Sequence, residues 1–125
     1  MSRPSDLPEL GLGYPGTELR RQLVAAVLSG EKTATAGLAA ESDQLDEIGA
    51  RYVVEDENGT PRAVVEITEV RIIPAAEIDL AFARDEGEGF ESVEDWRAAH
   101  ERFFEQPIEP ETMIEAVRFR VVERL

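Results

Sequence analysis

Two runs of β-branched residues joined by a hairpin signal constrain the fold of this chain most strongly. Residues 51–54 and 62–73 both have the Val- and Ile-rich pattern of strands, and Asn58-Gly59 between them suits the tight turns that match strand twist. A further strand is predicted over residues 113–125. Because no strand–helix–strand alternation appears, the sequence predicts a mostly antiparallel sheet and not a parallel one.

Two helices accompany these strands. Apolar residues recur at helical spacing over residues 17–29, and Gly30 ends this helix because glycine accepts the left-handed conformation of a helix stop. Ser92 is placed to cap a second helix, on which Trp96 and His100 belong to one apolar stripe. We therefore predict an α+β fold, a small and mostly antiparallel β-barrel flanked by helices.

The 125 residues are the length of one domain. Residues 1–16 are rich in Pro and Gly and are predicted to form an irregular arm. The apolar residues of 62–73 fall on both faces of the strand, which predicts a bulge or burial on both sides.

The chain has no apolar run of the roughly 20 residues that a membrane span needs and no signal-like stretch, so we expect a cytoplasmic protein.

The charge balance narrows the partners. Thirteen Lys and Arg face 27 Asp and Glu, which gives a net charge of −14. Since binding to long polyanions comes mostly from cationic side chains that release counterions, long DNA and membranes are not expected partners. The chain has no Cys and only one His, which excludes zinc–thiolate sites, iron–sulfur clusters and sites of several histidines. No metal and no cofactor is predicted.

Lys32 is the only lysine in the chain and lies just after the first predicted helix. Lysine can act as a base or nucleophile once it has lost its proton, whereas arginine cannot. The sequence therefore offers two interpretations of Lys32, a residue with a chemical role or a surface lysine that remains by chance.

Residues 30–35, Gly-Glu-Lys-Thr-Ala-Thr, follow an amphipathic helix and resemble the G-x-K-x-x-T pattern of ASCH domains, relatives of the PUA fold. The later elements are similar in order as well: the long strand, an acidic loop at 85–89, the helix of Trp96 and His100, and the closing strand. The resemblance covers residues 10–125. It implies a single ASCH domain, a PUA-like barrel with a cleft beside the motif.

The resemblance implies two classes of function. ASCH domains are proposed to bind RNA, which implies a nucleobase-type ligand, from a short single-stranded RNA or a small nucleoside or nucleotide, in a cleft centred on Lys32. One branch instead deacylates N4-acetylcytidine, and an amidohydrolase of this kind would use Lys32, Thr35 and either Glu86 or Glu88. Thr35 would supply a hydroxyl and a neutral Lys32 would accept its proton, whereas a charged Lys32 would clamp a phosphate or carbonyl. A ribonuclease, described for another branch, ranks lower because of the acidic charge.

Further residues are candidate ligand contacts: Gly30, Thr33, Arg51, Trp96 and Arg118. Backbone N–H groups near Gly30 could bind an oxyanion, the two arginines a phosphate, and the Trp96 ring a base. The alternatives are ion pairs between the arginines and surface carboxylates, and burial of Trp96 in the core. We expect His100 to be structural, because it lies on the same stripe as Trp96.

Overall fold

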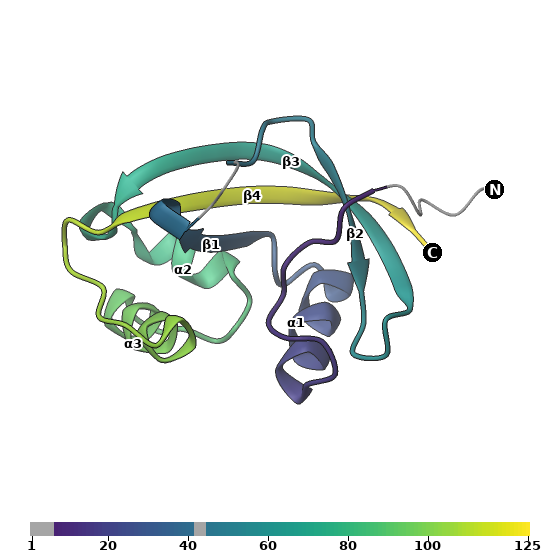
Figure 1. The fold of residues 1–125 in the computed structure, drawn as a ribbon, viewed down its shortest axis with the longest axis horizontal. Helices are drawn as coiled ribbons and strands as arrows, with labels where there is room; N and C mark the ends of the chain where they lie inside the picture. Colours follow the sequence, from purple (N-terminus) through teal and green to yellow (C-terminus); the bar gives the residue numbers. More distant parts are fainter. Residues whose placement is uncertain (1–6, 42–44) are drawn as a thin grey trace.

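Four antiparallel strands form one curled sheet in the order β1-β4-β3-β2 (Figure 1). The structure, a computed structural model, describes residues 7–41 and 45–125. The strands are β1 (Ala34–Leu38), β2 (Arg51–Glu55), β3 (Pro61–Pro74) and β4 (Met113–Arg124). Since the two edge strands do not pair with each other in the described part of the chain, the sheet is a half-barrel. The predicted α+β class is confirmed.

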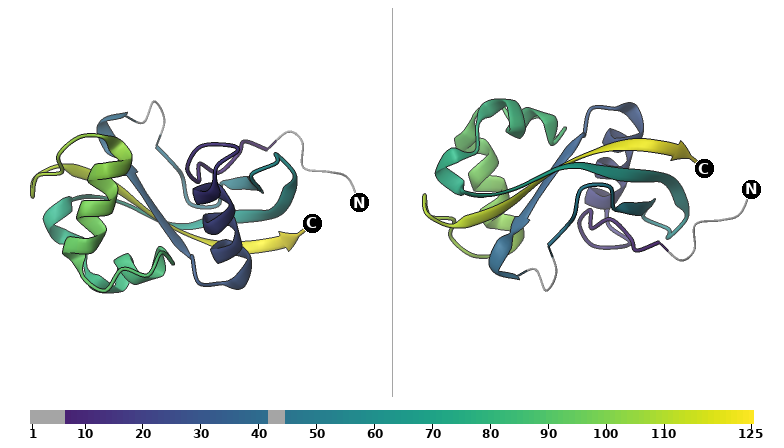
Figure 2. Two further views of the ribbon diagram at one scale, coloured as in Figure 1. Left: turned by 90° about the horizontal axis from the view of Figure 1, so that it is seen from below. Right: turned by 90° about the horizontal axis from the view of Figure 1, so that it is seen from above.

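All three α-helices lie on one side of the sheet, as Figures 1 and 2 show. They are α1 (Glu18–Ser29), α2 (Leu80–Asp85) and α3 (Val93–Phe104), and short 3-10 helices span Ala39–Glu41 and Ala75–Glu77. The cap predicted at Ser92 is present, because its hydroxyl accepts a hydrogen bond from the first turn of α3, and the Thr17 hydroxyl caps α1 in the same way. None of the described helices is long and apolar enough to span a membrane.

The long strands β3 and β4 carry two separate hydrophobic cores. The first core lies under α1 and contains Leu10, Leu12, Leu23, Val24, Val27, Val54, Ala63, Val65, Ile67, Val117 and Phe119. The second lies under α2 and α3 and contains Ala34, Leu38, Ala75, Ile78, Phe82, Ala83, Trp96, Ile108, Ile114 and Ala116. The connection from α1 to β1 therefore passes from one core to the other, and it carries the motif singled out in the sequence.

The mixed apolar phase of β3 has the predicted origin. The pairing of β3 with β4 shifts register between Val64 and Val65 and again between Ile67 and Glu69. Consecutive residues can therefore both be buried, and Val64 and Val65 are 3% and 0% exposed. These irregularities also bend the strand, which lets the sheet curl over two cores.

The described part of the N-terminal arm is packed against β2, although it forms no helix or named strand. The N–H of Leu10 donates to the carbonyl of Val53, and the N–H of Val53 donates to the carbonyl of Pro8, both over 2.9 Å. Leu10 and Leu12 are buried in the first core. The arm is therefore part of the folded unit from residue 8 onward, while residues 1–6 of the predicted arm lie outside the described residues.

Buried Arg20 of α1 holds the arm in place. Its guanidinium pairs with the Glu9 carboxylate and donates to the carbonyls of Glu55 (3.0 Å) and Gly13 (3.1 Å). One side chain therefore connects α1 to the arm and to the end of β2, and it is almost completely removed from solvent.

We predict that Arg20→Met lowers the free energy of unfolding by about 2–3 kcal/mol, because buried carbonyls lose their hydrogen-bond donor. The control is Arg21→Met, the adjacent exposed arginine that pairs with Glu18; its loss should stay below about 0.5 kcal/mol. Urea unfolding of the two variants measures the difference. Equal losses would contradict the role given to Arg20.

Candidate functional site

A cavity of about 440 Å³ lies between α1, β1 and α3, where the two cores meet. Leu12, Leu19 and Leu23 form the wall on the α1 side, and Phe103 and Phe104 form the wall on the α3 side. The polar side chains that line it are those of Lys32, Thr35, Glu86, Glu88, His100 and Arg102. A pocket of this size, with apolar walls and few polar groups, is typical of sites for small molecules.

Lys32 lines this cavity and is shielded from solvent, since it is only 2% exposed. Its Nζ donates to the carbonyls of Ala34 (2.9 Å) and Glu86 (3.1 Å). Carboxylate oxygens of Glu86 and Glu88 lie 3.7 and 3.8 Å from the same nitrogen. Three of the four residues predicted for catalysis thus meet around one amine, and the fourth, Thr35, lines the same cavity from β1.

Local backbone geometry brings Lys32 to this position. Gly30 ends α1 with a φ of 88°, in the left-handed region, and the N–H of Lys32 still donates to the carbonyl of Ala26. One residue later, the N–H of Thr33 donates to the carbonyl of Asp85 at the end of α2 (2.8 Å). The segment is therefore fixed between α1 and α2 before β1 begins.

Gly87 allows the turn after α2 to approach the lysine backbone. Its φ is 72°, and a Cβ atom at this position would lie 2.7 Å from both the N and the Cα of Lys32. Any other residue would push the two segments apart. The acidic loop predicted at 85–89 is therefore packed at this point, and the side chain of Glu86 is 1% exposed.

Three side chains hold the Glu86 carboxylate. The indole N–H of Trp96 donates to one oxygen, while His100 Nε2 and Lys32 Nζ lie 3.3 and 3.7 Å from the other. Burial alone would raise the pKa of Glu86, but His100, Lys32 and Trp96 together outweigh it and hold the pKa below its usual value. Glu86 is thus a buried anion with a fixed orientation.

His100 belongs to the site, which the sequence did not predict. Its ring stacks on Trp96 at 4.4 Å between centroids, and Nδ1 lies 2.8 Å from the Trp96 carbonyl. Burial lowers the pKa of His100, but the hydrogen bond and charge of Glu86 raise it by more, so the net shift is upward. Both ring nitrogens face acceptors, as an imidazolium requires. Glu86, the partner that gives His100 this role, lies outside the helix of His100. The apolar stripe of that helix therefore could not indicate the contact.

Glu88 is the less constrained of the two carboxyls. Its side chain is 25% exposed and lies 3.8 Å from Lys32. Burial, and then the charge of Glu86, raise the pKa of Glu88 by more than Lys32 lowers it. Of the two glutamates that the sequence left open, Glu88 is therefore the one whose pKa is raised, whereas that of Glu86 is lowered.

Five predicted ligand contacts do not line the cavity: Gly30, Thr33, Arg51, Trp96 and Arg118. Arg51 is exposed on β2 and pairs with Glu66 (3.1 Å), and Arg118 on β4 pairs with Asp85 (2.6 Å). Trp96 is 1% exposed and lies behind the cavity wall. Gly30 and Thr33 shape the backbone that presents the lysine. The arginines have carboxylate partners, the alternative considered from the sequence.

The described residues include no group of three or more His, Asp or Glu side chains arranged to hold a metal ion. The one histidine of the cavity is already bound to Glu86. The protein instead offers an amine, a hydroxyl and two carboxyls at the inner end of an apolar pocket, and these groups can bind a polar ligand.

Comparisons with known proteins agree with this architecture. The sequence model of the ASCH domain matches residues 13–123. A protein of Enterococcus faecalis V583 with a solved crystal structure is 26% identical, with a TM-score of 0.78 over 95% of this chain and 82% of that one. An ASCH domain from Lactobacillus crispatus JV V101 is 27% identical, with a TM-score of 0.72 over 82% of this chain and 71% of that one. No curated protein matches.

We predict that Gly87→Ala destabilises the protein by about 2 kcal/mol or more, because strain at positive φ adds to the overlap with the Lys32 backbone. Gly89→Ala is the matched control. Gly89 has a φ of 81° but open space where a Cβ would stand, so only the strain, about 1 kcal/mol, should appear. Thermal and urea unfolding measure both. Similar losses for the two variants would show that the close approach to Lys32 is unimportant.

The raised pKa of His100 predicts a pH-dependent stability. A histidine whose pKa is raised by folding stabilises fully below its ordinary pKa of about 6.5, and this contribution disappears as the pH rises through the folded value. The stability gap between the wild type and His100→Gln should therefore be largest near pH 6 and narrow at higher pH. Urea unfolding followed by circular dichroism from pH 6 to 9 measures the gap. A gap that stays constant or widens would contradict the charge assigned to His100.

Proposed function

This chain belongs to the ASCH domain family, and we propose that its cavity binds one nucleobase-type ligand with Lys32 at the centre. The family has a PUA-like fold that is thought to bind RNA. The observation that carries the proposal is the buried lysine, flanked by two carboxyls, at the inner end of a 440 Å³ cavity. The ligand is a modified nucleoside, a nucleotide, or one exposed base of a short single strand.

The polar groups match the edge of a base that carries an exocyclic amine. Cytosine presents an amine donor beside ring-nitrogen and carbonyl acceptors. Glu88 can accept from the amine, while Lys32 can donate to the adjacent acceptor. Thr35 adds a hydroxyl that donates or accepts. Donor and acceptor thus stand side by side on the protein, as they do on the base.

The apolar walls suit the faces of the same base. Leu19 and Leu23 from α1 stand opposite Phe103 and Phe104 from α3, and these side chains can cover a planar ring on both sides. The net charge of −14 disfavours an extended polyanion but does not hinder a single base or nucleoside. We therefore propose that one nucleotide unit, and not a long strand, enters the cavity.

Hydrolysis of an acylated base amine is the second candidate, favoured by the presence of Lys32, Thr35, Glu86 and Glu88 at one cavity. In this proposal the Thr35 hydroxyl gives its proton to Lys32 and attacks the acyl carbonyl. The carbon–nitrogen bond then breaks, and the amine leaves with a proton from Glu88, since Glu86 is held as an anion. Water hydrolyses the resulting threonine ester.

Binding ranks first because Lys32 already donates to two carbonyl oxygens and faces two carboxylates, the surroundings of a fixed cation. As an ammonium it polarises or holds a carbonyl, whereas the hydrolytic step needs its neutral form. The two candidates place the same ligand in the same orientation. They differ in whether a covalent bond changes.

The test is titration calorimetry with cytidine and N4-acetylcytidine. We expect Lys32→Met to weaken binding by about tenfold or more, because a buried charged donor is lost, and Thr35→Val to weaken it several-fold. Thr60→Val, in the turn between β2 and β3, is the matched control and should bind as the wild type does. Cytidine release from N4-acetylcytidine, followed by chromatography, separates the candidates.

Turnover that disappears in both Lys32→Met and Thr35→Val would favour the hydrolase. Binding without turnover would favour a binding protein. If neither nucleoside binds or reacts, and a short single-stranded RNA does not bind at low salt, the proposed function is wrong. Circular dichroism of each variant checks that the fold is retained.

A further inference from the structure

Arg102 of α3 lines the cavity and forms no ion pair with a carboxylate of the described residues. Most other described arginines are paired in this acidic chain: Arg20, Arg21, Arg51, Arg62, Arg71, Arg118 and Arg120. Arg84, Arg97 and Arg124 also lack such a pair, but they do not line the cavity. Among the described arginines, only Arg102 both lacks a carboxylate partner and lines the cavity that contains Lys32.

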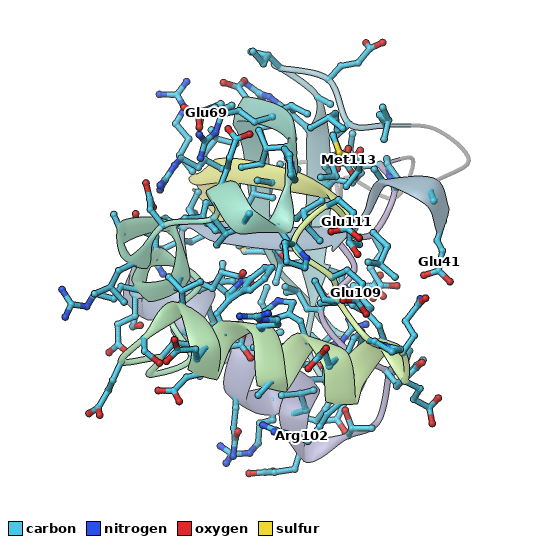
Figure 3. All side chains as sticks on the ribbon, turned by 90° about the vertical axis from the view of Figure 1, so that its left-hand side faces the viewer. Glu41, Glu69, Arg102, Glu109, Glu111 and Met113 are labelled. Carbon is cyan, nitrogen blue, oxygen red and sulfur yellow. The ribbon has the colours of Figure 1, made fainter. Side chains whose placement is uncertain are left out.

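Helical spacing directs Arg102 toward the cavity. Ala99, Arg102 and Phe103 stand at positions i, i+3 and i+4 of α3 and all line it. Figure 3 shows Arg102 beyond α3 on the side away from the sheet, at the outer part of the fold. Tyr14 of the arm stacks on Phe103 at 5.5 Å between centroids. The arm and α3 together thus build the rim at which Arg102 stands.

The charges inside the cavity differ from those at this rim. At the inner end, Lys32 and His100 are matched by Glu86 and Glu88, all within one cluster. A neutral base fits such a balanced end, whereas a phosphate there would face two carboxyls. At the rim, Arg102 offers a guanidinium fork, which matches the oxygens of a phosphate.

We propose that Arg102 binds the phosphate of a nucleotide whose base occupies the inner end of the cavity beside Lys32. The preferred ligand is then a nucleoside monophosphate, or the terminal nucleotide of a strand, and not a free nucleoside. This inference rests on the proposed function of the cavity and adds the class of ligand. It makes Arg102 a specificity residue that distinguishes phosphorylated from unphosphorylated forms.

The experiment compares cytidine with cytidine 5′-monophosphate, and N4-acetylcytidine with its 5′-monophosphate, by calorimetry at low salt. We expect the wild type to bind each nucleotide about tenfold more tightly than its nucleoside, a gain that shrinks at high salt. Arg102→Gln should abolish the gain and leave nucleoside binding within about twofold of wild type. Arg102→Lys should retain part of it, because the charge remains while the fork is lost.

Arg97→Gln is the matched control, on the same helix but beside a separate, smaller cavity. It should keep the full gain. The inference is overturned if nucleosides bind but nucleotides bind no more tightly, if Arg102→Gln weakens both ligands equally, or if Arg97→Gln removes the gain as well. If no nucleoside and no nucleotide binds to the wild type, the proposed function itself fails and the inference fails with it.

Discussion

The contact between the segment after α1 and the turn after α2 determines the arrangement of the whole molecule. Lys32 donates to the Glu86 carbonyl, and Gly87 brings the two backbones together where no side chain would fit. Lys32 and Glu86 are 54 positions apart in the sequence. The contact joins the two hydrophobic cores, because α1 packs in the first core and α2 in the second. A buried ion pair is seldom a large source of stability, because desolvation offsets its attraction. We therefore infer that this cluster fixes the geometry of the site, while the packing of the two hydrophobic cores stabilises the fold.

The Glu86 carboxylate extends this geometry to α3. Trp96 and His100 are one helical turn apart and both contact it, so a single carboxylate orients the helix that forms one cavity wall. On the other side, Arg20 holds the arm that forms the opposite wall. Each wall is thus fixed by a buried charge, while the surfaces that would touch a ligand are mainly apolar. Rigid polar anchors behind apolar walls are what a preorganised binding site requires.

Local signals predicted much of the fold. The cap at Ser92, the hairpin at Asn58-Gly59 and the mixed phase of β3 were each predicted from a few neighbouring residues, and all agree with the structure. Two residues of the motif, Lys32 and Thr35, line the cavity, whereas Gly30 and Thr33 do not. The family resemblance supplied this part, since composition alone left Lys32 ambiguous.

The remaining features depend on long-range contacts that periodicity cannot reveal. His100 looked like a core residue of its helix stripe because the partner that gives it a charge, Glu86, comes from another element. In the sequence, Arg102 is one of several charged residues of its helix. It differs from Arg97 because it lines the cavity that α1 also lines.

The single tryptophan has a practical consequence. Trp96 donates to Glu86 and stacks on His100, so the chain's only indole is in contact with the charged groups behind the cavity wall. A protonated imidazole quenches indole emission, and a neutral one does so much less. The intrinsic fluorescence of the unmodified protein therefore reports the charge of His100 at the inner end of the cavity, without any attached dye.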